Sequence, residues 1–187
     1  MADVPDTLSC ASRDEWRRWL HENHAASSEA WLKIRRQRAR GPGISLDEAV
    51  EEALCFGWID GLLQPIDENW YALRFSPRQA DSPWSARNIG RVERLLAAGL
   101  MAPAGQTQID LARANGQWDA ALRREQVDRI PPELETALSE QPGALAAYAA
   151  LPASRKKQLL YWLDSAKRPA TKVKRIQAIV AELSPTD

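Results

Sequence analysis

The stretch LCFGWIDGLLQPIDENWYALRFSPRQADSPWSARNIGRVER, residues 54–94, decides the fold, because apolar runs, Gly and Pro breaks and clustered arginines meet in it. Its start predicts the end of a helix, with Gly57 at a position that favours φ > 0. Residues 58–66 and 70–75 read as two strands around a turn at 67–69. Residues 81–85 then begin another helix. The stretch therefore predicts a β-hairpin between two helices.

Upstream of the hairpin, two capping boxes mark helix starts. Residues 12–15 (SRDE) begin a short helix to about Asn23, and residues 45–48 (SLDE) begin a helix with one apolar face. Residues 29–35 have the aromatic and β-branched content of a strand. We expect residues 1–11 to be a frayed lead-in. In the returning hairpin strand, alternation places Tyr71, Leu73 and Phe75 toward the core and Arg74 on the other side.

Downstream, a helix is predicted over 103–115, and residues 117–129 are ambiguous. The segment Ile130-Pro131-Pro132 is the best linker candidate, because two prolines cannot continue a helix. Four short helical patterns follow it. The chain is thus predicted to be α+β, with a small, mostly antiparallel sheet covered by helices in residues 1–129. A C-terminal all-helical unit occupies residues 130–187.

Composition excludes several classes of protein. The 187 residues are 44% hydrophobic and include eight tryptophans, enough for a sizeable core. Twenty-five basic residues balance 25 acidic ones, so nucleic-acid binding is not favoured and would need a local patch. Two cysteines and two histidines show no zinc spacing, so we expect neither a metal nor a cofactor. With no signal-like or membrane-spanning stretch, a cytoplasmic location is expected.

One polar constellation stands out as a candidate binding site. Asp60 lies in a predicted strand, where acids are disfavoured, and Asn88 and Arg91 are i, i+3 neighbours on one helix face. Guanidinium groups there could hold a carboxylate or phosphate, with a tryptophan stacking on the ligand. The predicted ligand-binding residues are Asp60, Arg74, Arg78, Trp84, Asn88 and Arg91.

A structural explanation competes with the binding site: Asp60 could pair with Arg74 or Arg91 as a buried bridge. Trp84, beside a proline in a loop, is expected to be partly exposed. Burial is expected for four other tryptophans, namely Trp16, Trp19, Trp31 and Trp162. His21 and His24 fall at a polar helix end and are expected to cap or be solvated. Cys55 reads as an inert core thiol.

The C-terminal helices carry a local positive charge. From Ala153 to Asp187 there are eight Lys or Arg and three acidic residues, a net charge of 8 − 3 = +5. Such a unit could touch phosphate backbones or an anionic membrane surface. The charges fall on several helix faces, however, and we expect a solvated surface that complements acidic residues elsewhere.

Several motifs, taken together, resemble the YdeI/OmpD-associated family, also called bacteriocin-protection proteins. They are EEALCFGWIDG, RFSPR, WS with Asn88, and RVERL, followed by PPEL and LPASRKKQLLYWLDSAKRPATKVKRI. The resemblance extends from about Trp16 to Leu183. It implies a role in resistance to cationic antimicrobial peptides or in association with an outer-membrane porin, and supplies no catalytic residue.

The leading expectation is therefore a non-enzymatic protein that binds an anionic small molecule or a protein partner through the Asp60, Arg74 and Arg91 region. The context would be stress or antimicrobial-peptide resistance. One alternative is an enzyme with Asp60 as acid/base, which requires a deep pocket around a desolvated Asp60 close to an arginine. A second alternative is nucleic-acid contact through the basic C-terminal helices.

Overall fold

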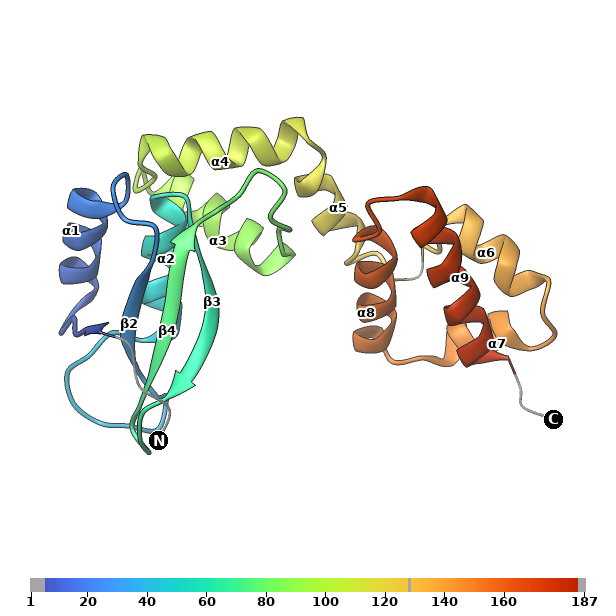
Figure 1. Cartoon of the computed structure of the whole chain (residues 1–187), viewed down its shortest axis with the longest axis horizontal. Coiled ribbons are helices and arrows are strands. Elements are labelled where there is room, and N and C mark those ends of the chain that lie inside the picture. The colour runs from blue at the N-terminus through green and yellow to red at the C-terminus, as the bar shows by residue number, and fades with distance from the viewer. Residues whose placement is uncertain (1–5, 128, 185–187) are drawn as a thin grey trace. The chain divides into compact units, whose positions relative to one another are not determined.

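A computed structural model describes residues 6–127 and 129–184 (Figure 1). Backbone contacts divide the chain into an N-terminal unit, residues 1–118, and a C-terminal unit, residues 119–187. The division falls within α5 (Gln117–Arg123), upstream of the prolines at 131 and 132. The architecture is α+β, as predicted: the first unit contains the sheet, and the second is helical.

The sheet has four strands in the order β1-β2-β4-β3. Its strands are β1 (Thr7–Leu8), β2 (Ala30–Arg35), β3 (Trp58–Pro65) and β4 (Trp70–Pro77). The hairpin β3–β4 and the pair β2–β4 are antiparallel, whereas β1 pairs with β2 in parallel. The predicted lead-in thus contains a short strand, because Thr7 and Leu8 find partners in β2 that local sequence does not reveal.

The helices of the N-terminal unit begin and end close to the predicted positions. They are α1 (Arg13–Asn23), α2 (Leu46–Cys55), α3 (Ala86–Ala97) and α4 (Pro103–Ala114). The capping box of α2 is complete: the Ser45 hydroxyl accepts from the Glu48 amide, and the Glu48 carboxylate accepts from the Ser45 amide. Gly57 follows α2 with φ +74°, and a Cβ there would lie 3.0 Å from the Ala104 carbonyl oxygen of α4.

Aromatic side chains join one face of the sheet to α1. The Trp16 ring lies 5.4 Å from Phe75, and the Trp19 ring lies 5.9 Å from Trp58. Tyr71, Leu73 and Phe75 are buried, which confirms the predicted alternation, although Ala72 on the opposite face is buried as well.

The C-terminal unit is helical, as predicted. Its main helices are α6 (Pro132–Ser139), α7 (Ala144–Ala150), α8 (Ala153–Asp164) and α9 (Pro169–Leu183). Pro132 opens α6, a position where its missing amide hydrogen costs nothing. The helices surround one apolar cluster, made up of Leu134, Leu138, Ala144, Tyr148, Leu159, Leu163, Ile176, Ile179 and Leu183.

The predicted burial of the tryptophans is wrong in several places. Trp84 is 4% exposed, because it packs against Trp118 at 5.4 Å. Trp162 is 40% exposed rather than buried. Trp19 and Trp31 are half-buried, and only Trp16 among the four lies fully in the core.

Candidate functional site

The six residues predicted to share one recess lie in three separate groups. In the first, Arg91 of α3 is buried against α2, where it pairs with Asp47. Its Nη1 also donates to Asn88 Oδ1 at 2.8 Å. Asp47 was not among the predicted residues, and it takes the place expected for Asp60.

The second group is Arg78 with Trp84, in the loop between β4 and α3. The guanidinium lies 4.1 Å from the Trp84 ring centre, and its Nη2 donates to the Pro83 carbonyl at 2.9 Å. Burial lowers the pKa of Arg78 to about 10, an effect that the charge of Asp60 opposes. Arg78 therefore stays protonated at neutral pH and holds its own loop in place. At 4% exposure it offers a ligand almost no surface.

The third group is Arg74, whose Nη1 contacts Glu29 Oε2 at 3.4 Å. Asp60 is half-buried opposite Phe75, where a bulge interrupts β3. The suggested bridge from Asp60 to Arg74 or Arg91 does not occur, because those arginines pair with Glu29 and Asp47. The negative charge of Asp60 instead acts to raise the pKa values of Arg78 and Tyr71.

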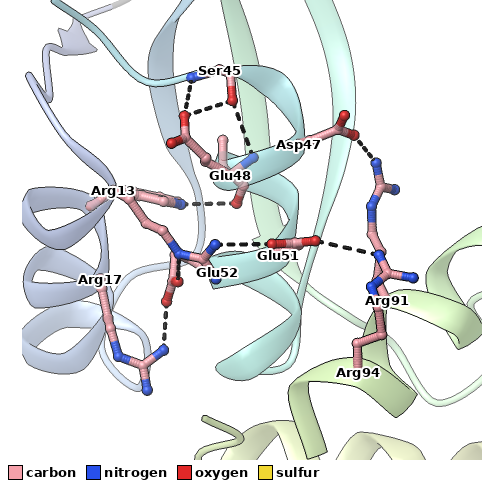
Figure 2. Close-up of polar contacts among 11 residues, drawn as sticks. Arg13, Arg17, Ser45, Asp47, Glu48, Glu51, Glu52, Arg91 and Arg94 are labelled. Atoms are coloured by element: carbon pink, nitrogen blue, oxygen red, sulfur yellow. Dashed lines mark hydrogen bonds and ion pairs between the residues drawn. The ribbon is translucent and has the colours of Figure 1, made fainter. Parts of the chain in front are cut away.

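A larger ionic network surrounds α2, as Figure 2 shows, with arginines reaching it from both α1 and α3. Its centre is Glu52, which is 1% exposed and pairs with both Arg13 and Arg17. Burial alone would lower the pKa values of these arginines, but the hydrogen bonds and charge of Glu52 raise both above the usual value. Sequence reasoning missed this centre, although a Glu-Glu pair inside an apolar helix was a visible signal.

The second acid of that pair, Glu51, is bound on both sides. Its carboxylate contacts Arg13 at 3.0 Å and Arg94 at 3.5 Å. Asp47, one turn earlier, pairs with Arg91 and with Arg87 at 3.0 Å. These pairs fix α1 and α3 against α2, so most of the network is structural.

A concave site lies at the N-terminal end of α2, and we call it the arginine cleft. Its volume is about 390 Å³ on the side of α3 and about 500 Å³ on the side of β2, and Asp47 and Arg87 line both parts. The β2 side is lined by Arg35, Arg36, Gln37, Ser45, Leu46, Asp47, Tyr71 and Arg87. Three arginines thus face one aspartate. Either volume suits a small-molecule ligand.

The arginines of the β2 side are held by backbone carbonyls. Arg35 Nη1 donates to the Ala39 oxygen at 2.7 Å, and Arg36 Nε donates to the Asp67 oxygen at 3.2 Å. Within residues 6–127 and 129–184, neither guanidinium has an ion pair with a carboxylate. Carbonyls orient these groups without neutralising them, so their charge is available to an anion.

Tyr71 adds a neutral donor to the cleft. Burial raises the pKa of Tyr71, an effect that Arg36 opposes, so the phenol keeps its proton at neutral pH. The Arg36 guanidinium lies 5.3 Å from the Tyr71 ring centre. Neither histidine lines this cleft: the His24 Nδ1 lies 2.8 Å from the Leu20 carbonyl, and both rings contact Phe56. The cleft thus offers anion binding rather than acid/base catalysis by histidine.

Part of the basic surface of the C-terminal unit is paired with acids from other helices. Arg155 pairs with Glu182 at 2.6 Å, and Lys172 pairs with Glu133 at 3.0 Å. The pair with Lys172 contributes to a lowered pKa for Glu133, through the side-chain hydrogen bond first and the charge second. These pairs match the expected surface in which basic residues complement acidic ones. The paired cations are less available to a phosphate backbone than the net charge of +5 in residues 153–187 suggests.

Comparison with known families divides the chain in the same region as the fold. Residues 8–108 match the family described as "Domain of unknown function (DUF8412)", which covers more than half of the chain. Residues 129–184 match the family described as "Bacteriocin-protection, YdeI or OmpD-Associated". The predicted family is therefore confirmed for the C-terminal residues, whereas the hairpin motifs fall within the first match. No curated protein and no solved structure matches the chain.

Among the described residues, no helix combines the length and the apolarity that crossing a bilayer requires.

Proposed function

We propose that this chain, which belongs to the DUF8412 family and carries a C-terminal YdeI/OmpD-associated region, binds an anionic small molecule in the arginine cleft. One observation carries the proposal: Arg35 and Arg36 line a concave site, are oriented by carbonyls, and have no carboxylate partner among the described residues. Arg13 and Arg17, by contrast, are neutralised by Glu52, and Arg78, which also binds carbonyls, is 4% exposed and is not available to a ligand.

The charges define the ligand class. Arg35, Arg36 and Arg87 against Asp47 leave the β2 side of the cleft with an excess of two positive charges, 3 − 1 = +2. A guanidinium binds carboxylates and phosphates through paired N–H groups, and both anions fit the site. Arg87 is exposed and shares Asp47 with Arg91, so it can turn toward a ligand while Arg91 holds the aspartate. A phosphorylated or polycarboxylated small molecule is the expected occupant.

The test is thermal unfolding of the full chain in inorganic phosphate and in citrate, at low and high sodium chloride. A ligand present at ten times its Kd stabilises the native state by RT ln 11, about 1.4 kcal/mol. For a unit of this size, that corresponds to a rise in Tm of roughly 4–8 °C. We expect the rise to shrink as salt screens the arginines.

Two matched variants decide where the anion binds. Arg36→Ala/Arg87→Ala removes two cleft cations, and Arg18→Ala/Arg113→Ala removes two exposed arginines outside the cleft. The proposal requires that the first variant lose the Tm rise and that the second keep it. An equal rise in both variants, or none in the wild type with either anion, would refute it.

We further propose that this binding serves stress or antimicrobial-peptide resistance. The support is the description of the family that matches residues 129–184, which names bacteriocin protection. Cells that lack the chain should then be more sensitive to a cationic peptide. The wild-type chain should restore resistance, whereas the Arg36→Ala/Arg87→Ala variant should not. Full restoration by that variant would separate the resistance role from the cleft.

A further inference from the structure

The sheet has one face that α1 and α2 do not cover. These helices contact the face that carries Phe75 and Trp58. Within the described residues of the N-terminal unit, Figure 1 shows α2 behind the strands and no helix in front of them. By strand register and alternation, the open face carries Trp31, Lys33 and Arg35 of β2, Trp70, Ala72 and Arg74 of β4, and Gln64 of β3. We call this surface the open sheet face.

The Trp70 indole is one of two rings on the open sheet face on which a planar group can stack. On one side its ring meets the chain at Gly43, where a Cβ would lie only 2.5 Å from the indole Cη2. Gly43 also has φ +138°, a conformation that side chains disfavour. The Lys33 ammonium group lies over the ring, 4.5 Å from its centre. A flexible lysine can be displaced by a planar ring, and its charge then remains beside the incoming group.

A second indole, Trp31, lies at the other end of the same strand pair. It is opposite Arg74, whereas Trp70 is opposite Arg35, four residues further along β2. Four residues of strand span about 13 Å. The two rings are therefore far enough apart to take two different planar groups, with Lys33 between them.

The cations of this face are weakly neutralised. Within the described residues, Lys33 and Arg35 have no ion pair with a carboxylate. Arg74 contacts Glu29 at 3.4 Å, but both side chains are well exposed, at 35% and 47%, and such pairs contribute little. The chain as a whole is neutral, so this local excess is the kind of patch that binding to a polyanion requires.

Two buried polar atoms on the open sheet face lack hydrogen-bond partners. They are the Arg74 Nε, a donor, and the Gln64 Oε1, an acceptor. Gly61 lies next to Arg74, and a Cβ there would lie 3.6 Å from an Arg74 nitrogen. Unsatisfied buried groups are costly, but both atoms lie below the accessible surface, so a ligand on this face contacts the exposed part of the Arg74 side chain instead.

We propose that the open sheet face binds single-stranded nucleic acid, separately from the anion in the arginine cleft. Bases stack on Trp31 and Trp70, and Lys33 and Arg74 contact phosphates. Trp31 and Trp70 are half-buried, and stacking on such rings requires unpaired bases, so a duplex does not fit. An acidic peptide would satisfy the cations but would leave both indoles without a planar partner.

The test is fluorescence anisotropy of labelled twelve-nucleotide single strands of oligo-dT and oligo-U with the full chain, at 50 and 300 mM salt. We expect binding at low salt that weakens steeply at high salt. Losing one stacked base costs about fivefold or more in affinity. Trp31→Leu/Trp70→Leu should therefore weaken binding at least about 25-fold, with an unchanged circular dichroism spectrum as the check on folding.

Lys33→Gln provides a variant that leaves the core intact, and Lys174→Gln of α9 is its matched control for charge. The first should weaken binding and reduce its salt dependence, and the second should do neither. The Arg36→Ala/Arg87→Ala variant should keep oligonucleotide binding, which separates this inference from the proposed anion site. Absence of binding at 50 mM salt would overturn the inference. Equal binding by all variants, or stronger competition by polyglutamate than by unlabelled oligo-dT, would also overturn it.

Discussion

The buried carboxylate of Glu52 allows a sharp test of what holds α1 to α2. Glu52 is 1% exposed, whereas the side chains of Arg13 and Arg17 are both 32% exposed. The two sides of this network are therefore unequal. Without its cations, Glu52 would be a buried charge with no counter-ion, whereas without Glu52 the arginines could turn toward water.

This asymmetry fixes the order of the expected effects on the free energy of unfolding. Removing one side of a buried pair costs roughly 3–5 kcal/mol. Because both arginines are partly solvated, we expect the lower part of that range, about 3 kcal/mol, for Arg13→Met/Arg17→Met. Glu52→Gln keeps the shape and an acceptor oxygen, so it should cost only about 1–2 kcal/mol. The combination Arg13→Met/Glu52→Met/Arg17→Met should return to within about 1 kcal/mol of wild type.

Urea unfolding at pH 7 measures these differences, and the tryptophans make it specific to one unit. Seven of the eight lie in residues 1–118, and Trp162 alone lies in the C-terminal unit. In a Trp162→Phe background, tryptophan fluorescence therefore reports only the N-terminal unit. Glu51→Gln is the matched control: Glu51 is 21% exposed, and its replacement should cost less than about 1 kcal/mol.

Two results would refute this reasoning. If Glu52→Gln destabilised the unit as much as Arg13→Met/Arg17→Met, burial of the carboxylate would not be the dominant cost. If the triple variant were as unstable as the double arginine variant, the loss would come from arginine packing rather than from an uncompensated charge.

Three further predictions concern single positions. Hydrogen bonds from Ser45 lower the pKa of Glu48 below its usual 4.5, so the capping box stabilises the folded state above that pH. Ser45→Ala should therefore lower the free energy of unfolding by about 1 kcal/mol at pH 7. In urea titrations, this difference from wild type should shrink as the pH falls below 4.5. Trp84→Ala should cost about 3–5 kcal/mol by chemical unfolding because Trp84 is buried, whereas the exposed Trp162→Ala should cost less than about 1 kcal/mol; equal costs would contradict the burial of Trp84. Gly57→Ala should cost about 1–3 kcal/mol, because φ is +74° and the added Cβ meets the Ala104 carbonyl at 3.0 Å; a neutral or stabilising effect in thermal unfolding would contradict it.

The parts of the fold that could be predicted from the sequence are those set by local signals. The capping box at Ser45, the helix-ending Gly57 and the alternation in β4 all act within a few residues, so the sequence alone locates them. The strand at Thr7 and Leu8 could not be found in this way, because it exists only through its parallel pairing with β2. Trp84 was misplaced for the same reason: it stands in a loop, and its burial depends on Trp118, 34 positions away.

The prediction of the candidate site was wrong about which charged residues pair with one another. Arg91 was paired with Asp60 because both lie in the stretch that organises the fold. The structure pairs it with Asp47, on a helix that begins 45 residues before it in the sequence. Charge partners are set by helix packing, and neither spacing nor periodicity encodes which helix face meets which. The sequence does show a run of arginines at the end of β2 and just after it, namely Arg35, Arg36, Arg38 and Arg40.

That run explains why binding is assigned to the arginine cleft and the open sheet face rather than to the predicted recess. Arg13, Arg17 and Arg91 have carboxylate partners and hold helices together, so a ligand would have to break a structural pair to use them. Arg35 and Arg36 are fixed by carbonyls and form no ion pair within the described residues, although the charge of Arg35 acts on Glu48, so an anion can bind without breaking an ion pair. Arg78 is also bound by carbonyls, but it is 4% exposed. A binding surface is therefore marked by arginines that lack a carboxylate partner and also line an open site, rather than by the number of arginines.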